Sequence, residues 1–232
     1  MRKQGLIGAI ALAAALAAAP LATGQAASGP GTAAANISKT DVGSGFEVDA
    51  SGHAAANTTA SFKLEAGVLE LDAVPNFNFG TANVEDIATG DKELTIVNQA
   101  GGVAPTTTYD GNDAGKITVT DFRGNNAGWN LTAQTGTEFQ GPTADATIGM
   151  TSFEVGFNND GSEDTDLAPS FASKSIAGAS ASIVNAVAGN GAGRSSFLLD
   201  EATVQLVQQL KVQAGDYRAV VNWTLASTPD PE

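Results

Sequence analysis

Short runs in which apolar and polar residues alternate recur along most of this chain, and most of the runs end at or shortly before Gly, Asn, Asp or Pro. Alternation with a period of two places the apolar side chains of an extended segment on one face, whereas a helix needs a period of 3.6. The runs with this pattern are 60–73, 92–98, 116–122, 129–134, 182–187, 203–207 and 217–226. Many short strands with long polar loops predict an all-β fold, a β-sandwich of short antiparallel strands.

The first run is predicted to hold two short strands. Phe62 and Leu64 alternate with polar residues, Gly67 interrupts the pattern, and alternation resumes over 69–73. Pro75 lacks a backbone N–H to donate to a sheet, so it is expected to end the second strand.

The segment 197–210 fits two kinds of structure. Its larger apolar residues also recur at a helical spacing, at Leu199, Ala202, Leu206 and Leu210. Short apolar runs leave this ambiguity open, so a helix remains an alternative to a strand here.

Charge and cysteine content exclude several classes of protein. The 232 residues include 11 Lys and Arg against 25 Asp and Glu, and the net charge is −14. A nucleic-acid partner is not expected, because binding phosphates requires a cationic surface. The chain has no Cys, so disulfides, thiolate zinc sites and thiol nucleophiles are excluded. The length suits one β domain with appendages.

The N-terminus has the three parts of an export signal. Arg2 and Lys3 precede an apolar run at 6–19, and Pro20 and small residues ending at Ala26 follow. A membrane span needs about twenty apolar residues, so we predict a cleaved signal peptide over 1–26, with an uncleaved anchor as the alternative. Cleavage removes two basic residues and no acidic one, which leaves 9 basic and 25 acidic side chains and a net charge of −16.

Residues 27–58 are mostly small and polar and are predicted to form a flexible leader before a β domain over 59–232. No second apolar segment of spanning length follows, and the last residues, WTLASTPDPE, carry neither an apolar tail nor a basic run. No membrane span is therefore expected after signal cleavage. Any attachment to the cell is expected to be non-covalent.

Both tryptophans lie in a Trp-x-Leu tripeptide. These are Trp129 with Leu131, and Trp223 with Leu225. Residues i and i+2 of a strand share a face, so each Trp and Leu point the same way, and Val221 extends the second stripe. The stripe favours a core position. The alternative is an aromatic platform for a sugar or peptide.

Together with these two tripeptides, the chain closely resembles the WxL-domain family of Gram-positive surface proteins over about 60–232. The resemblance rests on four ordered blocks, at 69–80, 117–134, 191–197 and 214–229. It implies a non-enzymatic C-terminal module that attaches the protein to the cell wall by binding peptidoglycan. It also implies partnership with other surface proteins, some of which bind host matrix. The motif residues carried over as candidate ligand-binding residues are Trp129, Leu131, Trp223 and Leu225.

No catalytic residue and no cofactor is predicted. His53 is the only histidine, so a catalytic triad or a His-ligated metal would have to use this one residue in the leader. The glycine-rich stretch 189–193 lacks the spacing and the Lys of a phosphate-binding loop. We predict an inter-strand loop that uses positive φ at glycine.

Two acidic clusters, at 110–113 and 158–166, raise the question of calcium. The second cluster could offer several oxygens, from Asp160, Glu163, Asp164 and Asp166. Its spacing differs from that of a helix-loop-helix calcium site, and such turns form without an ion. No metal site is predicted, and a secreted subunit that binds another protein remains the alternative to wall attachment.

Overall fold

The computed structural model describes residues 31–32, 46–47, 50–54, 60–97, 110–168 and 170–230. The chain divides into two compact units, Met1–Leu64 and Glu65–Glu232. In the first unit β1 (Gly31–Thr32) pairs in parallel with β2 (Phe46–Glu47). The predicted signal peptide and most of the predicted leader lie outside the described residues.

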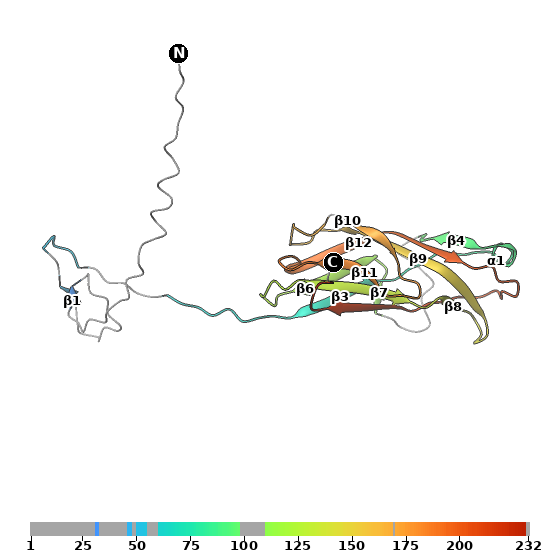
Figure 1. Ribbon diagram of the computed structural model, residues 1–232, viewed down its shortest axis with the longest axis horizontal. Coiled ribbons are helices and arrows are strands. Elements are labelled where there is room, and N and C mark those ends of the chain that lie inside the picture. The colour runs from blue at the N-terminus through green and yellow to red at the C-terminus, as the bar shows by residue number, and fades with distance from the viewer. Residues whose placement is uncertain are drawn as a thin grey trace, which may run out of the picture. The chain divides into compact units, whose positions relative to one another are not determined.

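The second unit contains two β-sheets (Figure 1). The larger sheet has the order β10-β9-β12-β6-β3-β5, with β4 paired to β12 and β8 paired to β9. Its strands are β3 (Leu69–Pro75), β4 (Lys92–Thr95), β5 (Gly111–Asn112), β6 (Lys116–Asp121), β8 (Glu138–Gln140), β9 (Thr147–Asn159), β10 (Ser170–Ser175) and β12 (Gly193–Leu206). The smaller sheet has the order β11-β7-β13, made of β11 (Ala181–Ala186), β7 (Trp129–Thr135) and β13 (Val221–Ala226).

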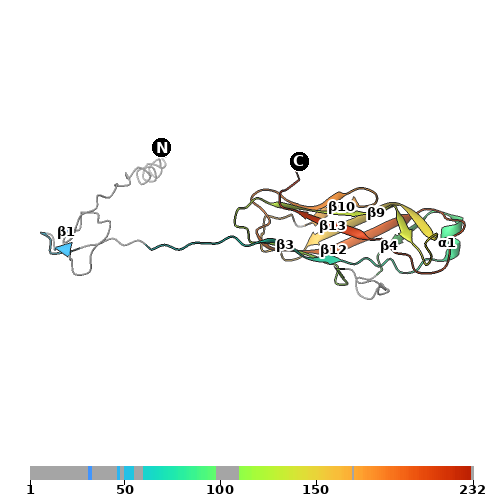
Figure 2. The same ribbon diagram turned by 90° about the horizontal axis from the view of Figure 1, so that it is seen from below.

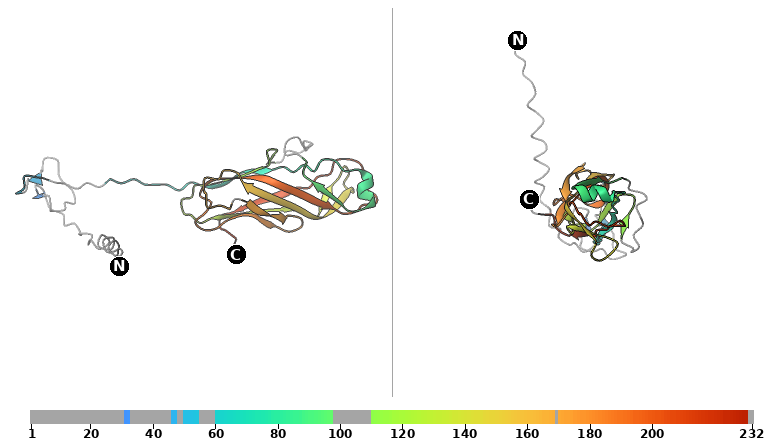
Figure 3. Two further views of the ribbon diagram at one scale, coloured as in Figure 1. Left: turned by 90° about the horizontal axis from the view of Figure 1, so that it is seen from above. Right: turned by 90° about the vertical axis from the view of Figure 1, so that its right-hand side faces the viewer.

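The core lies between the two sheets. The Trp129 ring on β7 packs edge-to-face on Phe197 of β12, with centroids 6.4 Å apart, and Phe157 of β9 packs in the same way on Trp223 of β13 at 6.2 Å. The right-hand panel of Figure 3 looks along the strands and shows them surrounding this interior. The predicted all-β sandwich is confirmed.

A single short helix, α1 (Val84–Thr89), is present in the described part of the chain. It lies at one end of the sandwich beside β4 (Figure 2). Buried Ile87 joins it to the core, and its backbone carbonyl accepts a hydrogen bond from Gln209 N at 2.9 Å. No helix among the described residues is both long and apolar enough to cross a membrane.

Most of the predicted strands are confirmed, within a few residues at their ends. β4 and β6 fall within the predicted runs, and the bounds of β7 and β11 differ from theirs by one residue. β13 begins at Val221, four residues later than predicted, because Arg218 pairs only as an isolated bridge with Gln140.

The predicted strand at Phe62 and Leu64 is wrong. These side chains are 87% and 84% exposed, and the backbone forms no strand there. Pairing with the sheet begins further along, where Gly67 N donates to Phe122 O at 2.8 Å. Two alternating apolar residues are too few to form a strand without a neighbour to pair with. The second strand, β3, ends at Pro75, as predicted.

The helical alternative for 197–210 is wrong, because β12 continues as a strand to Leu206 between β6, β9 and β4. The sequence patterns also missed β8, β9 and β10. β9 is the second-longest strand among the described residues. Its register with β12 shifts twice, and at the shift between Gln205 and Leu206 the extra residue, Thr151, lies in β9 and interrupts the alternation of its buried side chains.

Candidate functional site

A groove of about 1160 Å³ opens between the two sheets. We call it the cross-sheet groove. One wall is the segment 71–84, which continues from β3, and the other is the segment 212–223, which leads into β13. Buried side chains close its inner side, namely Ile148, Phe153, Val204 and Leu206. Segments more than a hundred residues apart in sequence therefore build one concave surface, the usual form of a binding site.

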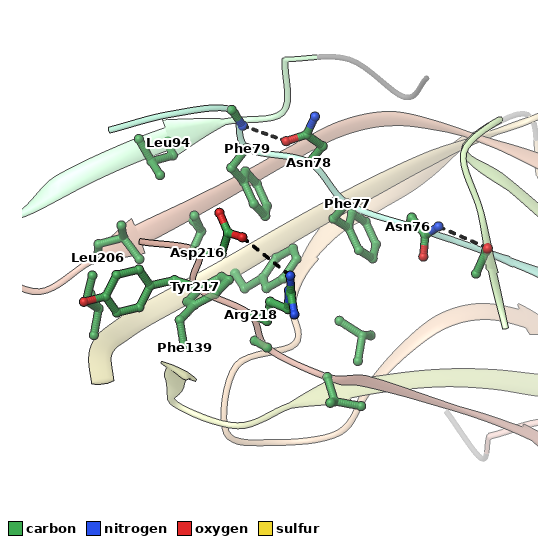
Figure 4. Close-up of a pocket in the computed structure, with 18 of the residues that line it drawn as sticks. Asn76, Phe77, Asn78, Phe79, Leu94, Phe139, Leu206, Asp216, Tyr217 and Arg218 are labelled. Carbon is green, nitrogen blue, oxygen red and sulfur yellow. Dashed lines mark hydrogen bonds and ion pairs between the residues drawn. The ribbon is translucent and has the colours of Figure 1, made fainter. Parts of the chain in front are cut away.

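Six aromatic side chains are among the residues that line the groove, and Figure 4 labels four of them. Phe77 and Phe79 each pack edge-to-face on buried Phe153, with ring centroids 5.1 Å apart. Phe139 and Tyr217 lie across from them. All four rings are partly exposed, so their free faces are available to a ligand while the core holds them in place.

Two asparagines fix the wall that carries Phe77 and Phe79. Asn76 donates its side-chain Nδ2 to Asp113 Oδ1 at 2.9 Å and to Gly111 O at 3.1 Å. Asn78 Oδ1 accepts from Gly80 N at 2.9 Å, in a turn where Gly80 has φ +70°. Asn and Phe alternate in this Asn-Phe-Asn-Phe sequence. The amide side chains hydrogen-bond the loop, and the two rings line the groove.

The opposite wall is fixed around Tyr217. Its hydroxyl donates to Gln213 O at 2.9 Å and accepts from Gln213 N at 3.2 Å. Arg218 and Gln140 exchange two backbone hydrogen bonds of 2.7 and 2.8 Å. A Cβ at Gly141 would overlap the Tyr217 ring at 2.6 Å, so glycine allows the ring to lie against this backbone.

Charges in the groove are unequal in sign. Four aspartates and one arginine line it, namely Asp72, Asp110, Asp113, Asp216 and Arg218. Arg218 Nη2 lies 3.6 Å from Asp216 Oδ2. Asp72 accepts a hydrogen bond from the Thr120 hydroxyl at 2.6 Å. The groove therefore combines apolar ring faces with a net negative charge.

One edge of β13 beside the groove has no partner strand among the described residues. Thr135 uses both backbone groups on the side away from β13, since its N–H donates to Ile176 O and its C=O accepts from Gly178 N. Thr135 and Val221 are therefore a non-hydrogen-bonded pair, and the backbone groups of Val221, Trp223 and Leu225 point off the open edge. Such an edge can accept an added strand.

The structure separates the two Trp-x-Leu motifs. Trp129 and Leu131 lie on the central strand of the smaller sheet and are 0% exposed. The Trp129 indole donates to Gly191 O at 2.9 Å. Trp223 is mostly buried but lines the cross-sheet groove, and Leu225 is partly buried against the core. The prediction that both tryptophans are at least half buried is confirmed.

Arg123 joins the two motif strands to the larger sheet. Its Nε and Nη2 donate to the two carboxylate oxygens of Asp121 on β6, at 2.9 and 2.7 Å. It also donates to Gly128 O, just before Trp129, and to Ser227 O, just after β13, both at 2.7 Å. The guanidinium lowers the pKa of the Asp121 carboxyl below its ordinary value, against the opposing effect of burial.

Comparison with known families identifies the domain. A family model described as "WxL domain surface cell wall-binding" matches residues 49–229. The chain belongs to this family. No curated protein and no solved structure gives a significant match. The protein is thus an extracellular, cell-wall-associated protein, and its WxL domain belongs to a family of binding domains.

Sequence reasoning missed several residues that line the groove of this WxL domain. Phe77, Phe79, Tyr217 and Arg218 lie in blocks that carried the family resemblance, but none of them was predicted to bind a ligand. The Asn-Phe-Asn-Phe alternation after Pro75 was the available signal, because it places two rings on one side of a segment outside regular pairing.

The acidic segment 158–166 accepts hydrogen bonds from neighbouring loops of the WxL domain. Glu163 Oε2 accepts from Arg194 N at 2.9 Å, and Asp164 Oδ2 accepts from Gly191 N. Asp160 forms a 2.8 Å ion pair with Lys116. In the described part of the chain, no three His, Asp or Glu side chains are placed to hold a metal ion. The glycine stretch 189–193 is an inter-strand loop with positive φ at Gly189, Gly191 and Gly193, as predicted.

Proposed function

We propose that this protein attaches non-covalently to the cell wall by binding peptidoglycan in the cross-sheet groove, and that it does so as part of a surface protein complex. The observation that carries the proposal is the groove itself. It is preformed, partly apolar and lined in large part by two of the sequence blocks that carry the family resemblance, 69–80 and 214–229. Trp223 is the motif tryptophan that we assign to the ligand, and Trp129 is assigned to the core.

The chemistry of the groove supports a wall polymer as ligand. Ring faces such as those of Phe77 and Tyr217 stack on the apolar faces of sugars and on peptide side chains. Asparagine, aspartate and arginine groups at the rim can hydrogen-bond amides and hydroxyls. The groove has a volume of about 1160 Å³ and is lined by several separate segments of the chain, which suits a segment of a polymer.

A sedimentation assay on purified, protein-free peptidoglycan tests the proposal. The chain without its predicted signal peptide is expected to sediment with the polymer. A chain that stays in the supernatant but still binds intact cells would show that the partner is something other than peptidoglycan. Lysozyme-digested polymer serves as the control for trapping in the insoluble mesh.

A second candidate function is that of a secreted structural or adhesion subunit that binds another surface protein or a host protein. The open edge of β13 favours this alternative, because a partner's extended segment can pair with the backbone groups of Val221, Trp223 and Leu225. Cross-linking on intact cells, followed by identification of the linked chain, separates it from direct polymer binding. The family is one of binding domains, and we propose no catalytic activity.

A further inference from the structure

We infer that the cross-sheet groove recognises the peptide part of peptidoglycan, through the ammonium and carboxylate groups of that peptide, rather than the glycan strand. The inference rests on the proposed function and names the part of the polymer that the groove selects. The inference is based on the distribution of charge along the groove. This observation is independent of the family match and of the aromatic lining.

One end of the groove is anionic. Asp110 and Asp113 flank β5, next to the end of β3. Asp113 accepts a hydrogen bond from Asn76, a neutral amide that leaves the carboxylate charge uncompensated. No cation forms an ion pair with either aspartate among the described residues. With Phe77 close by in the same lining, this end suits an ammonium group, which both carboxylates and ring faces attract.

The other wall supplies a cation for an acidic group. Arg218 is the one basic residue among those that line the groove in the described part of the chain. Its backbone is fixed by Gln140, while its guanidinium lies 3.6 Å from Asp216, whose side chain is 65% exposed. A guanidinium has five N–H donors, so Arg218 can donate to a ligand carboxylate in addition to its existing partners.

A ligand with both charges fits this arrangement better than a neutral one. Wall peptides carry the ammonium of a diamino acid together with free carboxylates, whereas the amino sugars of the glycan are N-acetylated. A neutral glycan laid across Asp110, Asp113 and Arg218 would remove water from these charges without pairing them, which is unfavourable. Amino-acyl esters on anionic wall polymers also carry ammonium groups, but the phosphates of those polymers are repelled by an acidic chain.

Calorimetric titration with soluble ligands tests the inference. The probes are a wall stem peptide with a free diamino side chain, the same peptide N-acetylated on that side chain, and glycan strands stripped of peptide. The free-amine peptide is expected to bind at least about tenfold more tightly than the acetylated one, because acetylation removes one partner of a charge pair. Equal affinity for the two peptides, or tighter binding of the stripped glycan or of aminoacylated wall polymer, would overturn the inference.

Paired variants locate the interaction. The double variant Asp110→Asn, Asp113→Asn keeps side-chain shape and the acceptor for Asn76, and is expected to remove the preference for the free amine. Asp145→Asn, at an exposed aspartate that does not line the groove, is the matched control and should keep the preference. Arg218→Met should weaken the peptide but not its carboxamide derivative. Unchanged peptide binding in both groove variants would contradict the assignment.

Sedimentation with intact peptidoglycan, run beside the titrations, distinguishes a failure of the peptide inference from a failure of the proposed function. Binding to the intact polymer without binding to the stem peptide overturns the inference on the peptide alone. Loss of binding to both overturns the proposed function as well.

Discussion

At the scale of single residues, the two motif tryptophans have different surroundings and should give different mutant phenotypes. Trp129 is fully buried and its indole is hydrogen-bonded, so Trp129→Ala is expected to lower the free energy of unfolding by about 3 to 5 kcal/mol. Trp223→Ala should destabilise less, because that ring is partly exposed, but should reduce retention on peptidoglycan. Chemical denaturation and sedimentation on the same two proteins check both expectations.

Stability and wall binding of Phe139→Ala can be compared with those of Trp223→Ala, because Phe139 also lines the groove but from the opposite sheet. Loss of wall binding in a folded Trp223→Ala protein supports a ligand role. If Trp129→Ala and Trp223→Ala both retained full stability and full binding, neither residue would have the role assigned here.

The Asp121–Arg123 pair should make stability depend on pH in acid. The folded-state pKa of Asp121 lies below its ordinary value of 3.8, so its contribution is present above the unfolded pKa and is lost as the pH falls through the folded one. Asp121→Asn should therefore destabilise the protein at pH 7, by about 3 kcal/mol because it leaves a mostly buried arginine without its charge partner. The difference from the unmutated protein should shrink below about pH 3.8.

Urea unfolding at pH 7 and pH 3 measures this difference. Asp72→Asn, at an exposed aspartate bonded to a neutral hydroxyl, is the control. A gap between Asp121→Asn and the unmutated protein that stayed constant down to pH 2.5, roughly one unit below the ordinary carboxyl value, would contradict the linkage.

At the scale of elements, the loop between β11 and β12 supports the buried tryptophan. Gly191 has φ +81°, its carbonyl accepts from the Trp129 indole, and a Cβ there would collide with that ring. Gly189 has φ +98° and open space around it. Gly189→Ala is expected to cost about 1 to 2 kcal/mol from backbone strain alone. Gly191→Ala adds the steric clash and should cost clearly more.

Thermal unfolding of the two glycine variants tests the role of the loop. Near-ultraviolet circular dichroism should change in Gly191→Ala, because the environment of the indole changes, and stay the same in Gly189→Ala. Equal loss of stability in the two variants would mean that the loop does not support Trp129.

At the scale of the whole molecule, the acidic charge governs the salt response. The exported chain has a predicted net charge of −16, so a wall rich in anionic polymers repels it at long range. Salt screens this repulsion over about 10 Å at 0.1 M, while contacts between groups that touch inside a groove are screened much less. Binding to intact walls is therefore expected to hold or strengthen from low to physiological salt.

Wall sedimentation across a sodium chloride series checks this expectation, with a chelator arm to detect bridging divalent cations. Steady loss of binding as salt rises would indicate long-range attraction instead. Loss on chelation alone would reopen a calcium role for the acidic segment 158–166.

The sequence by itself determined the fold class and much of the strand content. Alternation is a local property, so runs such as 116–122 and 129–134 predict strands and buried faces without knowledge of their neighbours. The same alternation placed each Trp on one face with its Leu. The ordered blocks around these motifs were sufficient to predict the family.

Only the tertiary structure decided which strands pair and which motif lines the groove. The local pattern missed β9 because the extra residue that interrupts its alternation, Thr151, is placed by pairing with β12, whose partner residues lie 38 to 56 positions further along the chain. Trp129 is buried because its strand lies between β11 and β13, whereas Trp223 lies on an edge beside the groove. The groove needs Phe77 and Tyr217, 140 positions apart, to line the same surface, and such an arrangement depends on sheet packing rather than on any local pattern.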